Sequence, residues 1–120
     1  MDARLREGIR LFNAGQYFAS HESLEDFYQR AEEGHKPFVE ALIQLAAALR
    51  LFRDFGEARG PARMIRQAII RLENYQPRYL GIGVKSLIGA MELWAEEIEA
   101  DSETAAKRVP KISLRRFLLF

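Results

Sequence analysis

Apolar residues near the start of the chain recur at the three- and four-residue spacing of a helix surface. This spacing predicts a first helix that ends near Ala14 and carries Leu5, Ile9 and Phe12. Asp2 is placed to cap the start of that helix. Gly15 favours a turn at its end, because glycine readily takes the positive φ found there.

The next two segments also follow the helical period. A second helix is expected over residues 17–33, with Gly34 after it and an apolar stripe made of Tyr17, Ser20, Leu24, Phe27, Tyr28 and Ala31. Pro37 suits the first turn of a third helix that ends near Phe55. Because this third segment is apolar on nearly all sides, we expect it to be the buried central helix.

Two further helices are predicted in the second half of the chain. Pro61 opens one that ends near Leu72, and the other begins near Val84. Residues 74–83 lie between them and contain the breakers Pro77, Gly81 and Gly83. No segment alternates with period two, so no sheet is predicted. The prediction is an all-α, compact bundle of about five antiparallel helices over residues 1–104.

A basic and apolar tail, residues 105–120, follows the predicted bundle. Residues 92–103 contain six acidic residues and residues 107–116 five basic ones. Charge runs of this kind are typical of solvated surfaces, but the tail could also dock on an acidic surface of its own or a neighbouring chain. The end of the tail, after Pro110, is rich in large apolar residues. We therefore expect it to pack on the bundle or to mediate self-association, with membrane-surface contact as a third alternative.

Bulk composition narrows the function classes. The chain of 120 residues has a net charge of +1, which does not favour nucleic-acid binding in spite of an arginine-rich middle. It has no cysteine, which excludes thiolate metal sites and cysteine catalysis and suits a cytoplasmic location. The longest apolar stretch, residues 41–52, is interrupted by Gln44 and Arg50, so no transmembrane segment is predicted.

The candidate chemistry lies on the second predicted helix. His21 and Glu25 are four residues apart and share a helix face, with Glu22 beside them. A carboxylate next to an imidazole fixes its tautomer, as a general base requires, and the same groups are also metal ligands. Metal binding is the less favoured use, because a di-iron bundle needs two Glu-x-x-His motifs and the chain has only two histidines.

Gln44 is the other polar residue that stands out. It lies in the middle of the apolar third helix, with Glu40 one turn before it. If the second and third helices pack together, these residues could join His21 and Glu25 in one buried polar cluster. Such a cluster is either a structural lock or an active site, in which Gln44, Glu40 and Tyr17 would be candidate binding residues.

Several motifs together resemble a known family. They are Phe12-Asn13-x-Gly15-x-Tyr17-Phe18, His21-Glu22-x-Leu24-Glu25, Leu42-Ile43-Gln44-Leu45 and Tyr75-x-Pro77 with Gly81-Ile82. The chain is similar over residues 5–90 to small helical proteins catalogued as domain of unknown function 309. The resemblance implies a compact all-α fold and no established activity. Members carry a histidine near the end of the third helix, where this chain has Arg50 or Leu51.

Two functional hypotheses follow from these residues. The first is a non-enzymatic helical interaction or structural module with an unknown protein partner, held by a buried His-Glu-Gln cluster. The alternative is a hydrolase with its site at the first helical hairpin, in which His21 acts with Glu22 or Glu25, either by acid-base chemistry alone or with the help of a divalent metal.

Overall fold

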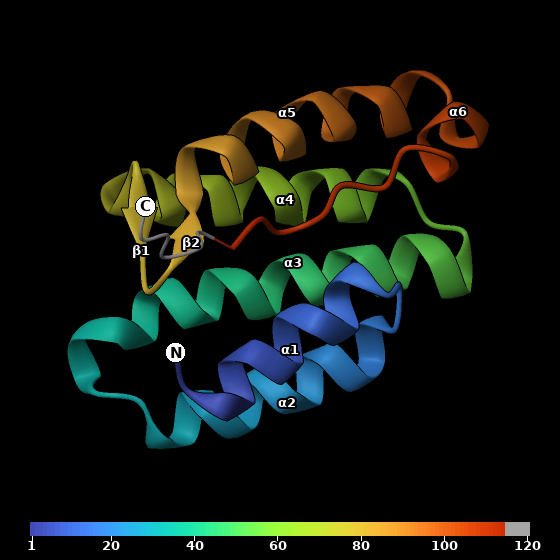
Figure 1. The fold of residues 1–120 in the computed structure, drawn as a ribbon. Helices are drawn as coiled ribbons and strands as arrows, with labels where there is room; N and C mark the ends of the chain where they lie inside the picture. The colour runs from blue at the N-terminus through green and yellow to red at the C-terminus, as the bar shows by residue number, and fades with distance from the viewer. Residues whose placement is uncertain (115–120) are drawn as a thin grey trace.

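The fold is an all-α bundle in which consecutive helices lie side by side and antiparallel (Figure 1). The structure is a computed structural model and describes residues 1–114. Within these residues it has six α-helices: α1 (Ala3–Asn13), α2 (Tyr17–Arg30), α3 (Lys36–Phe55), α4 (Arg59–Leu72), α5 (Val84–Ala100) and α6 (Ser102–Ala106). The predicted fold class is therefore confirmed, and α6 is an additional short helix.

Local sequence signals explain where α1 and α3 begin and end. The Asp2 side chain caps α1 by accepting a hydrogen bond from the backbone N–H of Arg4 at 2.8 Å. Pro37 occupies the first turn of α3, and Gly56 ends that helix with a φ of 69°. The prediction that α2 continues to Glu33 was wrong. Residues Glu33–His35 instead form a 3₁₀ turn that leads directly into α3.

α3 is the central helix of the core, as its apolar composition predicted. It packs against α2 and α4, and α4 in turn packs against α5. The side chains of Phe38, Leu42, Leu45 and Leu49 on α3 are completely buried. Burial of this kind stabilises the bundle by about 1.5–3 kcal/mol for each large apolar side chain.

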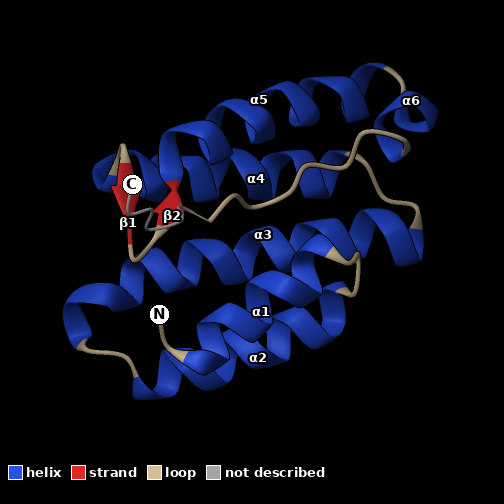
Figure 2. Ribbon diagram, viewed as in Figure 1, coloured by secondary structure: helices blue, strands red, loops and turns tan. Residues whose placement is uncertain are grey.

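The prediction that the chain has no sheet was wrong. A two-stranded antiparallel hairpin, β1 (Arg78–Tyr79) and β2 (Ile82–Gly83), follows a second 3₁₀ turn, Glu73–Tyr75. Figure 2 shows these strands in red at one end of the bundle, where β2 leads into α5. Both turn residues have positive φ, 50° at Leu80 and 82° at Gly81, as in the tight turns that match strand twist. Strands of two residues are too short to produce an alternating pattern.

After α6 the chain returns across the bundle as an extended segment, residues 107–114 (Figure 1). Ile112 is buried, and the backbone N–H of Gly83 donates to the carbonyl of Ser113. Ala105 and Ile112 belong to the same hydrophobic core as the helices, so the expected boundary at residue 104 does not interrupt the packing. The expected packing of the tail on the body thus holds for residues 105–114; residues 115–120 lie outside the described part.

Membrane insertion through a helix finds no support in residues 1–114. None of the helices there combines the length and the apolar character that crossing a bilayer requires.

Candidate functional site

The three predicted catalytic residues lie on α2 without converging on a common target. His21 is half-buried, whereas Glu22 and Glu25 are exposed. The side-chain hydrogen bonds of this part of α2 are made by its serines: Ser20 Oγ donates to the Gly8 carbonyl and Ser23 Oγ to the Arg4 carbonyl. Within residues 1–114, the side chains of His21, Glu22 and Glu25 form no hydrogen bond or ion pair, and only their backbone groups are bonded within the helix. Their catalytic role stays a prediction.

Gln44 is directed to α4. Its Nε2 donates to Gln67 Oε1 at 3.0 Å, and its Oε1 accepts a hydrogen bond from Arg71 Nη1 at 3.3 Å. Gln44 is half-buried, as is Glu40 one turn before it. The prediction of a buried cluster of His21, Glu25 and Gln44 was therefore wrong. Because α2 and α4 pack on different sides of α3, the amide that faces α4 is separated from α2.

Metal binding requires several ligands at one point. Within the described residues, no three histidine, aspartate or glutamate side chains come together as a metal-binding group. Tyr17, the remaining predicted binding residue, is buried and lines a cavity together with Arg53.

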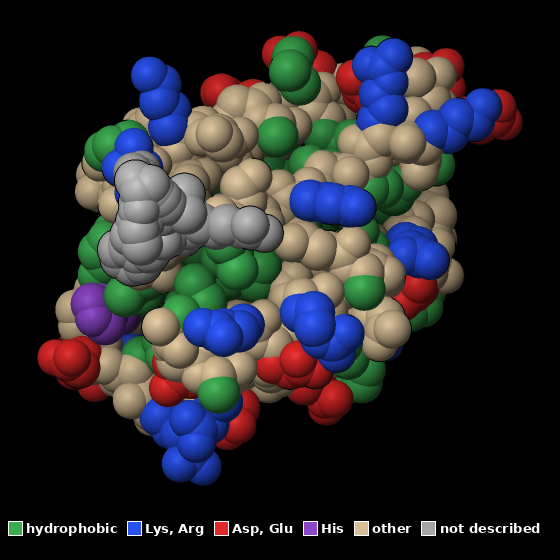
Figure 3. All heavy atoms as spheres, in the orientation of Figure 1, with side chains coloured by type: hydrophobic (Ala, Val, Ile, Leu, Met, Phe, Trp, Pro, Cys, Tyr) green, Lys and Arg blue, Asp and Glu red, His purple; other side chains and the backbone are tan. Residues whose placement is uncertain are grey.

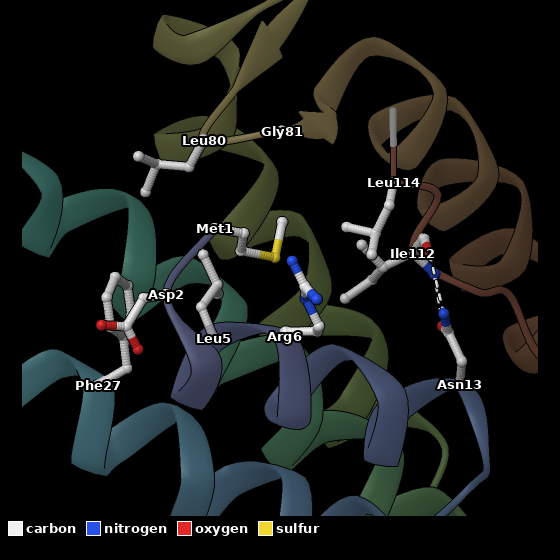
Figure 4. Close-up of a pocket in the computed structure, with 10 residues that line it drawn as sticks. All are labelled: Met1, Asp2, Leu5, Arg6, Asn13, Phe27, Leu80, Gly81, Ile112 and Leu114. Carbon is white, nitrogen blue, oxygen red and sulfur yellow. Dashed lines mark hydrogen bonds between the residues drawn. The ribbon is translucent and has the colours of Figure 1, made fainter. Parts of the chain in front are cut away.

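A large cavity, of about 1000 Å³, lies between the start of α1, the hairpin turn and the extended segment. Figure 4 shows Ile112 and Leu114 from the extended segment facing Met1 and Arg6, with Leu80 on the opposite side. The walls of this cavity are mostly apolar. Its lining residues are Met1, Asp2, Leu5, Arg6, Asn13, Phe27, Leu80, Gly81, Ile112 and Leu114. A cavity with a few polar groups among apolar walls is the usual form of a binding site.

Asn13 is the residue that orders one wall of this cavity. Its Nδ2 donates to the Ile112 carbonyl at 2.9 Å, and its Oδ1 accepts from the Ile112 backbone N–H at 2.8 Å. The side-chain amide thus pairs with both backbone groups of one residue in an extended segment. Helical spacing gives no indication of this pairing, because the partner of Asn13 lies 99 residues away along the chain.

The hairpin turn forms the opposite wall. Leu80 holds a left-handed backbone, which costs a leucine on the order of 1 kcal/mol. Ile82 and Leu114 form an antiparallel bridge, so the hairpin also contacts the extended segment. On this side the cavity is therefore lined by the hairpin turn, that is, by Gly81 and the apolar side chain of Leu80 (Figure 4).

His35, in the 3₁₀ turn before α3, anchors the hairpin. Its Nδ1 is hydrogen-bonded to Tyr79 Oη, and the rings of Phe38 and Tyr75 pack against Tyr79. Desolvation, followed by the neighbouring Tyr75, raises the pKa of the Tyr79 phenol. These aromatic contacts join the turn before α3 to β1 and fix the hairpin beside the cavity.

Apolar side chains gather on the face of the molecule that carries the extended segment, and Lys and Arg side chains surround them (Figure 3). An apolar patch with a charged rim is a common feature of interaction surfaces.

The family of this chain follows from residues 5–71, which match the model of the domain of unknown function DUF309. The chain belongs to this family. No match is found among curated proteins. The DUF309 region covers most of α1 and continues almost to the end of α4, whereas the hairpin, α5 and the extended segment lie beyond it. The large cavity is thus lined by residues from both parts, and the function of the family itself is not known.

Proposed function

We propose that this DUF309 chain is a non-enzymatic helical interaction module that self-associates by exchanging its C-terminal segment with a second copy. The proposal rests on the two hydrogen bonds between the Asn13 side-chain amide and the Ile112 backbone, which are called the Asn13 clamp below. This clamp recognises backbone groups of an extended strand, so the same segment of another copy satisfies it equally well. Exchange of an identical element between two copies preserves its contacts and is a low-cost route to a dimer.

The contacts of the segment support exchange in three further respects. Its buried side chain, Ile112, enters the core from outside the helices, and its backbone pairs with the edge of β2. One ion pair, between the exposed Arg108 and the half-buried Glu97 at 3.1 Å, lies at the start of the segment. An ion pair with one solvent-exposed partner contributes little, so most of the free energy that holds the segment comes from contacts that the exchanged dimer would preserve.

The sequence beyond Leu114 is also rich in large apolar residues. Residues 115–120 read Arg-Arg-Phe-Leu-Leu-Phe. They follow directly on Leu114, which lines the large cavity. A cytoplasmic location is part of the proposal and is supported by the lack of cysteine. The hydrolase alternative lacks comparable support, because the side chains it requires on α2 do not converge.

Exchange is tested by mixing two differently labelled preparations of the full chain and following resonance energy transfer between them. We expect mixed dimers whose fraction rises over about two orders of magnitude in protein concentration. Asn13→Ala should speed mixing, because the clamp must open before a segment is exchanged. The dimer fraction at equilibrium should change little, since the closed monomer and the exchanged dimer lose the same two hydrogen bonds.

Asn74→Ala is the matched control, because Asn74 is exposed on the 3₁₀ turn before the hairpin. It should leave both the rate and the dimer fraction as they are in the unmodified chain. Sedimentation as a monomer at every concentration would refute the proposal. So would dimers that mix at the same rate with and without the Asn13 amide.

A further inference from the structure

A second cavity, of about 510 Å³, lies at the other end of the extended segment, and the exchange proposed above does not use it. It is lined by Tyr17, Leu49, Phe52, Arg53, Gly56, Glu103, Ala106 and Val109. Leu49, Phe52, Ala106 and Val109 contribute apolar side chains to it, and three side chains with polar ends also line it: a phenol, a guanidinium and a carboxylate. Its size is within the range of small-molecule sites.

Arg53 is held in place by the first interhelical turn. Its Nη1 donates to the Gly15 carbonyl at 2.8 Å. A Cβ atom on residue 15 would lie 2.0 Å from that same nitrogen, so any other residue there would displace the guanidinium. Gly15 therefore has two roles: it supplies the φ of 79° that the turn needs, and it leaves room for Arg53.

The guanidinium has capacity left for a ligand. Within residues 1–114, Arg53 forms no ion pair with a carboxylate, and the Gly15 carbonyl occupies one of its five donors. A planar guanidinium with free donors is the group that proteins use to bind carboxylates in two-point contact.

Tyr17 adds a second polar group on the same side. Its ring centroid lies 5.9 Å from Arg53 Cζ, and the side chain is buried. Burial raises the pKa of the Tyr17 phenol, and the nearby Arg53 opposes this effect only in part. The phenol thus stays neutral and available as a hydrogen-bond donor at physiological pH.

Glu103 brings the opposite charge to the same cavity. It lies on α6, is exposed, and forms no ion pair with any residue in the described part of the chain. A cavity lined by one unpaired cation and one unpaired anion favours a ligand that carries both charges. The apolar side chains of Leu49 and Phe52, which also line the cavity, then favour an apolar side chain on that ligand.

We propose that this cavity binds a small apolar α-amino acid, with its carboxylate at Arg53 and Tyr17, its ammonium group at Glu103 and its side chain on Leu49 and Phe52. The proposal does not depend on segment exchange, because the charged groups come from α3 and α6 of one copy.

The binding test uses the full chain and the fluorescence of its one tryptophan, Trp94. The ring centroid of Trp94 is 5.0 Å from that of Phe52, which lines the cavity, so a bound ligand should change its emission. L-leucine and L-phenylalanine are titrated beside their N-acetylated and C-amidated forms. We expect saturable binding of the free amino acids and a dissociation constant at least about tenfold higher when either charge is blocked.

Substitutions of Arg53 and Glu103 test separately how the carboxylate and the ammonium group of the ligand are bound. Arg53→Gln should raise the dissociation constant of the free amino acids at least about tenfold, whereas Arg63→Gln, an exposed arginine on α4, should leave it unchanged. Glu103→Gln should remove the preference for the free over the N-acetylated form. Circular dichroism of each variant checks that the helices are retained.

Three results would overturn the proposal. They are the absence of saturable binding to the folded chain, equal binding of free and C-amidated forms, and affinity that is unaffected by Arg53→Gln.

Discussion

Gly8 is the residue on which the close approach of α1 and α2 depends. A Cβ atom at this position would lie 2.7 Å from Leu24 Cδ2 and 2.8 Å from Leu24 Cγ. Leu24 is completely buried and has no free space into which to move. The Gly8 carbonyl also accepts the hydrogen bond of the buried Ser20 hydroxyl at 2.7 Å. The missing side chain thus allows both an apolar contact and a polar one.

We expect Gly8→Ala to lower the free energy of unfolding by about 1–3 kcal/mol, because the added methyl group overpacks the interface with Leu24. Urea unfolding followed by circular dichroism measures this change. Gly89→Ala is the matched control, since Gly89 also lies within a helix and a Cβ there meets nothing within 4 Å. It should raise the free energy of unfolding by about 0.5–1 kcal/mol. A similar effect of both substitutions would refute the role of Gly8.

Residue roles could be predicted where the signal is local. Asp2 as a helix cap follows from its position before an apolar periodic stretch, and the structure confirms it. Gly8 gave no such signal, because a glycine within a helix does not reveal which residue packs over it. The hydrogen-bond partners of Asn13 and Gln44 could not be predicted for a related reason. Their side chains bond to partners on distant segments, and helical spacing alone does not identify those partners.

At the scale of elements, the end of α5 shows how one residue divides two helices. Asp101 has an extended backbone, with a φ of −157°, and its carboxylate caps α6. It accepts hydrogen bonds from the backbone N–H groups of Glu103 and Thr104 and, at 2.7 Å, from the Thr104 hydroxyl. On the other side of α6, the Trp94 indole donates to the Ala105 carbonyl at 2.9 Å. These contacts dock a helix too short to be stable alone.

The cap should make the stability of α6 depend on pH. The Thr104 hydroxyl, followed by its backbone N–H, lowers the pKa of Asp101 below the ordinary value of 3.8, against the opposing effect of desolvation. The unfolded chain therefore binds the proton first as the pH falls. The stabilisation is fully present well above pH 3.8 and is lost as the pH drops through the lower pKa of the folded state.

Asp101→Asn isolates this effect, because asparagine keeps a capping oxygen and does not titrate. We expect the unmodified chain to be the more stable of the two at neutral pH. Their unfolding free energies should converge as the pH falls below 3.8, the ordinary pKa of the group. Thermal unfolding of both chains across this pH range provides the measurement. A difference that is constant with pH would show that the charge of Asp101 does not matter.

Element prediction succeeded where apolar spacing extends over several turns. The five long helices are present, and α3 is the central one. The hairpin was missed because each strand has only two residues, and its turn places a leucine where local rules favour glycine or asparagine. The candidate site depends on this hairpin and on the returning segment. Both are positioned by tertiary contacts, so the cavity between them could not be predicted from periodicity.

At the scale of the whole molecule, the beginning and the end of the chain stabilise one another. The extended segment connects α1, through Asn13, with the hairpin, through Gly83 and Ile82. The Ile112 side chain is only 2% exposed and packs in the same core as the helices. Both cavities border this segment, which contributes Ile112 and Leu114 to the larger one and Val109 to the smaller one.

We expect Ile112→Ala to lower the free energy of unfolding by about 2–4 kcal/mol, with a single transition in urea, because the substitution leaves a cavity in a shared core. Lys111→Ala, at the exposed neighbouring position, should change it by less than about 0.5 kcal/mol. The cost of Ile112→Ala cannot exceed the free energy that holds the segment closed, since a chain with an open segment no longer buries this residue. A cost near zero would therefore mean that the segment opens before the bundle unfolds. In that case the extended segment would be a separate unit and would not share one core with the helices.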